Sequence, residues 1–339
     1  MTGTSLLLRK LCLHGLPLEM VAPEGLLKQY ANAWLDPFFV SDLPPGVVPT
    51  RGILRTYREG EVVRHLSTNA QRVTQVDPWF ELYQDGDCFW LVDERWGITE
   101  VNFLRGQWRS WILPGAVADP VRIAEGAVLW PLAQLMRPRG LHLLPAMSIA
   151  RGGWGALILA GFSLEPELSR LIRSGYRLVG QRWTAIREED GRIELLHVPG
   201  VVDRAAPPAP RRGLFGPSSH WVDLTREHAG TLANHAFCDQ ILVVEPGRRA
   251  KAHAVHLKPH EAQDLLRMNW PIVDIHPSRR GSQLAVRMAL QCRCADVQLS
   301  RNPDDLVLLL DSLRKGSPRP ELTIYRNSSS EQLVQRPAV

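Results

Sequence analysis

The segment from Gly152 to Glu189 constrains the fold of this chain more than any other. It contains an apolar run at residues 156–161, a turn, a segment of helical spacing that ends at Gly175, and a second apolar run that follows Tyr176. Near-continuous apolar runs are typical of strands that are covered on both faces of a sheet. The segment therefore predicts a strand, a turn, one helix and a second strand of an α/β sheet.

Alternating helix and strand patterns extend from Gly126 toward the C-terminus. Helical spacing covers residues 125–140, 259–268, 281–293 and 302–315. The last of these helices begins with Asn302 as its cap and Pro303 at its first position. Strand patterns cover residues 143–150, 176–186, 192–198, 238–246, 251–259 and 294–300. We expect an α/β core over residues 126–315 and a flexible C-terminal tail over residues 316–339.

Residues 1–125 show a different pattern, which predicts a smaller α+β domain rich in strands. Helical spacing is confined to Leu26, Leu27, Tyr30 and Trp34. Apolar and polar residues alternate over residues 51–58, 80–94 and 97–114, which predicts antiparallel strands. Asp85-Gly86 is a good signal for a hairpin between two of them.

Tryptophan is concentrated in this first region. The alternation places several of these residues on the inward face of strands, which favours packing in a core or interface. A platform on which bases or sugars stack is the alternative. The residues concerned are Trp79, Trp90, Trp96, Trp108 and Trp111.

Net charge, cysteine content and hydrophobicity indicate which partners and which cellular compartment to expect. The formal charge of +5 is small for 339 residues, and the basic residues occur in scattered pairs, so we do not expect the chain to bind nucleic acid. The five cysteines form neither a CxxC pair nor a disulfide framework, so a reducing, cytoplasmic location fits best. No apolar run approaches the roughly 18 residues that would span a bilayer.

Three short sequences give the chain a resemblance to a known family. They are GALILAG (155–161), RSGYRLVG (173–180) and TAIREE (184–189), and in order and spacing they resemble the HPr kinase/phosphorylase family and its shorter relatives. The resemblance covers roughly residues 126–310. It implies a P-loop-type α/β core in which a strand leads into a phosphate-binding loop, a helix ends at a glycine, and a later strand carries two aspartates.

The chain departs from that family at each position that would carry the chemistry. The phosphate loop needs G-x-x-x-x-G-K-[ST], because backbone N–H groups and a lysine surround the phosphates. No lysine is present in this turn or helix, Pro166 has no N–H, and acidic residues fill the first helical turn, where a phosphate would otherwise bind. The two aspartates align with Gln181 and Arg182, and the family's histidine aligns near Leu144 or Pro145. The degenerate nucleotide site therefore comprises Gly161, Phe162, Ser163, Glu165, Pro166, Glu167, Gln181 and Arg182.

Loss of the lysine and of both acids is hard to reconcile with phosphoryl transfer, which depends on positioning and charge neutralisation. We therefore expect a pseudokinase that binds neither ATP nor Mg²⁺ and has no catalytic or metal-binding residues. Its expected role is to bind another protein or peptide as an assembly or regulatory subunit, either as a homo- or as a hetero-oligomer. Two alternatives stay open: an accessory factor for peptide modification, and an unorthodox kinase acting on a peptide or protein serine with a lysine such as Lys251 or Lys258.

The remaining motifs have ordinary explanations. His253, His256 and His260 have the spacing of helical metal ligands, but Pro259 interrupts a helix, so His253 and His256 are expected on opposite faces of a strand. Cys292 and Cys294 have no partner cysteine nearby in the sequence. Residues 199–219 are rich in proline, glycine and arginine and predict an exposed loop, either idle or ordered by a partner.

Overall fold

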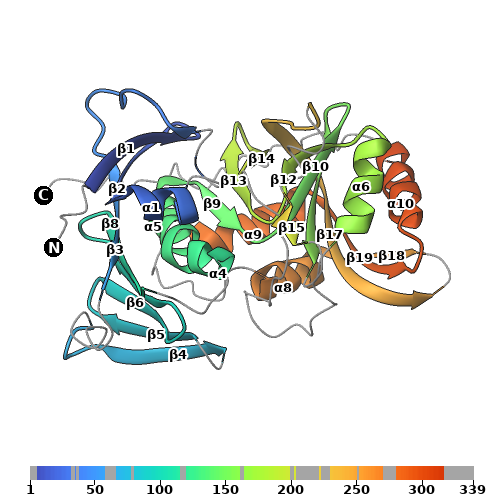
Figure 1. The fold of residues 1–339 in the computed structure, drawn as a ribbon. Coiled ribbons are helices and arrows are strands. Elements are labelled where there is room, and N and C mark those ends of the chain that lie inside the picture. The colour runs from blue at the N-terminus through green and yellow to red at the C-terminus, as the bar shows by residue number, and fades with distance from the viewer. Residues whose placement is uncertain are drawn as a thin grey trace, which may run out of the picture.

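The chain has a mixed α/β fold that is rich in strands and contains two large sheets (Figure 1). The computed structural model describes residues 6–31, 35, 38–57, 66–77, 80–114, 120–160, 164–198, 202–203, 221–222, 230–249, 252–269 and 280–316. A short ladder of β15 (Val202–Asp203) and β16 (Trp221–Val222) stands apart from both sheets. The predicted C-terminal tail beyond residue 316 and most of the predicted loop at 199–219 lie outside the described residues.

The first sheet has eight strands, in the order β1-β2-β3-β8-β7-β6-β5-β4. The strands are β1 (Leu6–Leu13), β2 (Leu16–Pro23), β3 (Thr50–Thr56), β4 (Gln71–Asp77), β5 (Phe80–Asp85), β6 (Cys88–Asp93), β7 (Gly97–Asn102) and β8 (Gln107–Ile112). Asp85 pairs with Cys88 across a two-residue turn, and Gly86 in that turn has a φ of +54°, which confirms the predicted hairpin.

The prediction that all strands of this region are antiparallel is wrong. β3 pairs in parallel with both β2 and β8. The chain between β2 and β3 passes through α1 (Glu24–Leu26) and η1 (Leu27–Ala31), where the predicted helix lies, and this crossover returns β3 in the same direction as β2. The hairpin of β1 and β2 was not predicted at all.

The described tryptophans of this region pack in the interior, as their alternation predicted. Trp108 is fully buried and donates from Nε1 to the carbonyl of Ala127 at 3.1 Å. Its ring lies so close to Gly52 that a Cβ there would meet it at 2.2 Å. Trp90, Trp96 and Trp111 are also buried, whereas Trp79 lies outside the described residues. The described tryptophans are core residues, and none of them forms an exposed stacking platform.

The second sheet has nine strands, and the long strand β17 joins its two parts. The order β12-β10-β11-β17-β14-β13-β9 runs along it, and β19 pairs with both β17 and β18. The strands are β9 (His142–Leu144), β10 (Met147–Arg151), β11 (Trp154–Ala160), β12 (Arg177–Gly180), β13 (Thr184–Glu189), β14 (Arg192–Leu196), β17 (His235–Arg249), β18 (His253–His256) and β19 (Arg293–Ser300). β11, β17 and β19 run parallel to one another at its centre.

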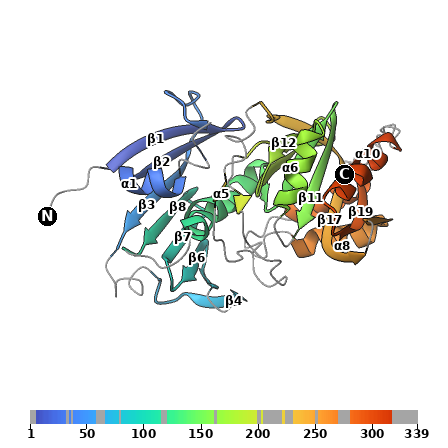
Figure 2. The same cartoon turned by 45° about the vertical axis from the view of Figure 1, so that its right-hand side comes forward.

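Helices cover both faces of the central strands (Figure 2). Leucines of α6 (Glu165–Arg173) and α10 (Asp304–Lys315) pack on one face. Apolar side chains of α8 (Pro259–Asn269) and α9 (Arg280–Gln291) pack on the other. Asn302 accepts a hydrogen bond from the N–H of Asp304 at 3.2 Å, so it caps α10 as predicted, although the helix itself begins at Asp304.

Two expected strands are each divided in the structure. Residues 143–150 form the end of β9 and most of β10, separated by Pro145 and Ala146. Proline has no N–H to donate to a ladder, so the chain changes strands there. Residues 176–186 are divided into β12 and β13 by a bend at residues 181–183. This second break falls on the candidate site.

A continuous helical run lies between the two sheets (Figure 1). It consists of α4 (Pro120–Ala124), the π-helix η3 (Glu125–Leu129), α5 (Trp130–Met136) and the 3₁₀ helix η4 (Arg137–Arg139). Its apolar side chains share one buried cluster with residues of the first sheet and with Leu143, Trp183 and Leu196 near β9, β13 and β14. None of the helices in the described ranges is long and apolar enough to cross a membrane.

Candidate functional site

The candidate site begins where β11 ends. β11 is buried along most of its length and runs parallel to β17, and the chain continues from it into α6. Glu165, Pro166 and Glu167 form the first turn of α6, as predicted. The turn before it, with Gly161, Phe162 and the expected cap Ser163, lies outside the described residues. The predicted helix end is present, because Gly175 follows α6 with a φ of +87°.

Glu167 is a half-buried acid at this helix start. Burial raises the pKa of its carboxyl group above the usual value. Its Oε2 is buried and has no hydrogen-bond partner among the described groups. An acidic side chain thus occupies the helix N-terminus, the position at which backbone N–H groups and the helix dipole favour an anion.

Gln181 and Arg182 follow the end of β12. β12 and β11 both pair antiparallel with β10, and they therefore run parallel to each other with β10 between them. Two strand spacings separate them, which is about 10 Å. The chain therefore leaves β12 in the same direction as it leaves β11, but not beside the start of α6.

Arg182 turns toward the helical run between the sheets. Its guanidinium donates from Nε and Nη2 to the two carboxylate oxygens of Glu125, the second at 3.2 Å. Trp183 donates from Nε1 to Oε1 of the same carboxylate at 3.1 Å. Glu125 is 1% exposed, so these three hydrogen bonds replace the water that the buried carboxylate would otherwise bind. The Arg182 side chain is thus part of a structural ion pair.

Gln181 is 5% exposed, and neither atom of its amide has a hydrogen-bond partner among the described groups. An amide cannot take up a proton at physiological pH, so Gln181 cannot act as the general base that an aspartate would provide. The predicted site residues are therefore distributed over two places: an acidic helix start, and a bend whose arginine is tied to Glu125.

Sequence reasoning missed Glu125 as a partner of this site. The signal available was a single acid within the otherwise apolar stretch Ile123–Trp130. A buried charge needs a partner, but 57 residues separate Glu125 from Arg182, and no local pattern identifies which of the arginines pairs with it.

A second missed cluster surrounds Glu194 in β14, which is 6% exposed. Its carboxylate accepts hydrogen bonds from Nε of Arg187 at 2.7 Å and pairs with Nδ1 of His235 at 2.9 Å. Nearby, His14, in the turn between β1 and β2, contacts the carbonyl of His197 through Nε2 at 2.8 Å. Nδ1 of His197 contacts the carbonyl of Val179 at 2.6 Å. Burial lowers the pKa of His14 to about 4 and lowers that of His197 as well, so both are neutral at pH 7.

The histidine and cysteine motifs lie elsewhere. His253 and His256 are exposed on β18, a strand as expected, and His260 is in the first turn of α8. Cys292 and Cys294 are buried with Cys238, where burial raises the pKa of the Cys294 thiol to about 12. Throughout the described part of the chain, no group of three or more His, Cys, Asp or Glu side chains is arranged to hold a metal ion.

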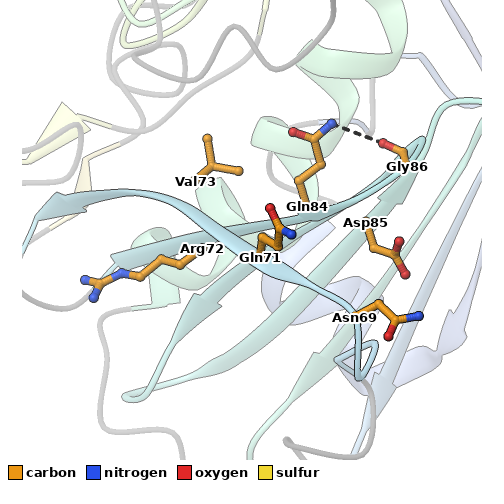
Figure 3. Close-up of a pocket in the computed structure, with 7 residues that line it drawn as sticks. All are labelled: Asn69, Gln71, Arg72, Val73, Gln84, Asp85 and Gly86. Carbon is orange, nitrogen blue, oxygen red and sulfur yellow. Dashed lines mark hydrogen bonds between the residues drawn. The ribbon is translucent and has the colours of Figure 1, made fainter.

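A polar depression of about 460 Å³ lies on the first sheet, beside β4 and β5 (Figure 3). Figure 3 shows amide side chains of both strands around it, and Nε2 of Gln84 donates to the carbonyl of Gly86 at 3.2 Å. It is lined by Asn69, Gln71, Arg72, Val73, Gln84, Asp85 and Gly86. It contains none of the residues of the candidate nucleotide site.

The sequence matches no protein-family model and no curated protein. Among solved structures, the chain is similar to the HPr(Ser) kinase/phosphatase from Coxiella burnetii, with a TM-score of 0.30 and 11% sequence identity. The match covers 51% of this chain and 94% of that chain. The likeness is distant, and nothing about the site or its activity follows from it.

Proposed function

We propose that this chain is a catalytically inactive protein of HPr-kinase-like type, a pseudokinase that acts by binding another protein or peptide. The proposal rests on the sequence resemblance at residues 155–161, 173–180 and 184–189 together with the geometry of the positions that depart from it. The observation that carries it is the bidentate pair of Arg182 and Glu125. A position that would serve metal binding or proton transfer in an active kinase here holds a cation that is used to join structural elements.

The start of α6 supports the same proposal. A triphosphate that approached this helix would meet the acidic side chain of Glu167 in the first turn, and Pro166 would offer it no N–H. Phosphoryl transfer needs positive charge to neutralise the transferred group. Acidic residues at the phosphate position make the free energy of nucleotide binding less favourable, whether or not catalytic residues are present.

Binding of Mg·ATP tests the inactive state directly. We expect isothermal titration calorimetry to detect no heat of binding and thermal-shift measurement to detect no change in melting temperature when Mg·ATP is added to the full chain. The matched control is the same titration with magnesium and no nucleotide. A dissociation constant in the micromolar range would overturn the proposal and would favour the unorthodox kinase.

The partner-binding half of the proposal has its own test. The tagged chain is purified from its native cells, a co-purifying protein is identified, and the two are mixed in purified form. We expect a complex that forms without nucleotide and leaves the partner unphosphorylated by intact-mass measurement. A partner whose serine gains a phosphate in the presence of Mg·ATP would contradict the proposal.

A further inference from the structure

A β-bulge lies in β17 where this strand passes beside β11. Gly155 of β11 pairs with Cys238, whereas the next residue, Ala156, pairs with Gln240. The parallel ladder therefore shifts register, and Asp239 is the extra residue of β17. Its carboxylate accepts a hydrogen bond from the N–H of Gly155 at 3.1 Å. Bulges are rare in parallel ladders, and where they occur they change the direction in which a side chain points.

The bulge turns Gln240 toward the helices α6 and α10. Cys238 packs in the apolar cluster on the α8 and α9 face, and in a regular strand Gln240 would lie on that same face. Leu242 and Val244 pack instead with leucines of α6 and α10. Gln240 shares their face, because it precedes them by two and four residues. It is 0% exposed, so the bulge places an amide inside an apolar layer.

Two buried polar groups on this face lack a hydrogen-bond partner among the described groups. One is the side-chain amide of Gln240, at both its nitrogen and its oxygen. The other is Nε1 of Trp154, a side chain that is 7% exposed. Trp154 belongs to the same apolar layer and lies two residues before Ala156, the partner of Gln240.

The indole and the amide are close enough to share one small molecule. Adjacent strands lie about 4.8 Å apart and each residue rises about 3.3 Å, which places the Cα atoms of Trp154 and Gln240 about 8 Å apart. Both side chains are long and lie on the same face of the sheet. A molecule between their polar ends can therefore contact both of them.

Two polar neighbours of this site already bond elsewhere. Tyr176 packs edge-on against the indole, with ring centroids 6.4 Å apart, and its hydroxyl donates to Oδ1 of Asp311 at 2.7 Å. Arg293 of β19 lies opposite the amide-bearing residue, and its Nη1 donates to the carbonyl of Gly316 at 2.8 Å. Neither contact includes the indole or the amide, which leaves these two groups in need of a partner.

The chemistry of the two groups indicates which molecule fits. Buried polar groups nearly always have a hydrogen-bond partner, because burying them without one is unfavourable. The indole is only a donor, whereas the amide has both donors and an acceptor. Both are almost completely buried, which favours the smallest molecule that can accept from one group and bond with either end of the other. Water meets this requirement and is a regular component of protein interiors.

We propose that a long-lived buried water molecule bridges Nε1 of Trp154 and the side-chain amide of Gln240, beneath α6 and α10. The water accepts a hydrogen bond from the indole and bonds with whichever amide atom faces it. The bulge at Asp239 creates the site, because it turns the amide toward the indole. The water connects β11 and β17 at the centre of the second sheet. This inference does not depend on the proposed function.

Water-selective NMR on the deuterated full chain tests the proposal. The indole signal of Trp154 is assigned as the one that the Trp154→Phe variant lacks. We expect a rotating-frame Overhauser cross-peak between this indole proton and water. Its sign should be opposite to that of the diagonal, which distinguishes a dipolar contact from hydrogen exchange. If the unaltered chain gives no such cross-peak, the proposal is overturned, and this outcome needs no variant to fold.

Gln240→Met makes the test specific, because it removes both polar atoms of the amide and nearly conserves the length of the side chain. The water loses an anchor, so the cross-peak at Trp154 should be lost. Oxygen-17 relaxation dispersion should count at least one fewer long-lived water than in the unaltered chain. Leu242→Met introduces the same side chain on the same face and should leave both measurements unchanged. A folded Gln240→Met variant that keeps the cross-peak and the water count would overturn the proposal.

Discussion

Arg182 and Glu125 are joined by two hydrogen bonds although 57 residues separate them. Arg182 lies in the bend between β12 and β13, and Glu125 begins the π-helix between the two sheets. The pair therefore links the second sheet to the helical run that packs against the first sheet. It makes the bend a structural junction, and stability measurements can test this.

Replacing Glu125 with Ala should destabilise the fold. The substitution leaves the Arg182 guanidinium and the Trp183 N–H without their acceptor, while Arg182 is only 26% exposed. Breaking a buried pair from one side costs about 3–5 kcal/mol, and the partial exposure of Arg182 places the expected loss in the free energy of unfolding near the lower bound, at about 3 kcal/mol. Urea unfolding monitored by circular dichroism measures it.

Glu24→Ala is the matched control for this measurement. Glu24 forms an exposed ion pair with Lys28 at 2.7 Å, one helical turn away. Exposed pairs of this kind contribute little to the free energy of unfolding, because water and salt screen them. Equal effects of the two substitutions would show that the Arg182–Glu125 pair is not a structural junction.

The acids at the start of α6 predict a change in anion binding. Combining Glu165→Gly with Glu167→Lys removes two negative charges from the helix N-terminus and adds a positive one. Two unit charges about 4 Å apart interact by about 1 kcal/mol in water, so sulfate and phosphate should bind at least about fivefold more tightly. Isothermal titration calorimetry with each anion measures the change.

Glu189→Lys in β13 controls for most of this change in net charge: it raises the charge by two units, whereas the α6 variant raises it by three. Its carboxylate is 50% exposed and far from a helix start along the chain. It should leave anion affinity unchanged. If the α6 variant also binds sulfate and phosphate no better than the unaltered chain, the acids do not occupy a former phosphate position.

His14 predicts a loss of stability in acid. Burial lowers its pKa to about 4 from an ordinary value of 6.5, so the folded state favours the neutral ring. The stability gained from the neutral ring is complete above pH 6.5 and is lost as the pH falls from 6.5 toward 4. The full loss is about 3 kcal/mol, because one pKa unit corresponds to about 1.4 kcal/mol.

His14→Asn isolates this contribution. The residue has a φ of +49°, a conformation that asparagine adopts more readily than most residues. Unfolding free energies of the variant should fall less steeply than those of the unaltered chain between pH 6.5 and 4.5. His256→Asn, at an exposed position of β18, should leave the slope unchanged. Parallel slopes for all three proteins would contradict the assignment to His14.

Local sequence patterns predicted the structural features that are specified by residues close together in the sequence. The capping of α10 by Asn302, the hairpin at Gly86, the interior tryptophans and the succession of β11 and α6 all follow from spacing, caps and turn residues. The acidic first turn of α6 was also readable in advance, because the residues that matter there are adjacent in the sequence.

The sequence did not predict features that depend on residues far apart in the chain, or it predicted them wrongly. The parallel pairing of β3 with β2 and β8 depends on a crossover and on a partner strand roughly 55 residues away, and alternation of apolar residues is the same for either direction. The break at residues 181–183 has a similar origin, because the pattern of residues 176–186 is that of one uninterrupted strand.

The absence of the lysine and the acids of the family that this chain resembles is evident from the amino-acid sequence alone, since residue identity does not depend on the fold. What the replacing residues do became clear only from the packing of the folded chain. Arg182 could have faced solvent, but the cost of burying Glu125 without a partner is met by bringing the two side chains together. Such a pairing arises when the whole chain packs, because a buried charge is balanced by whichever opposite charge the fold brings to it.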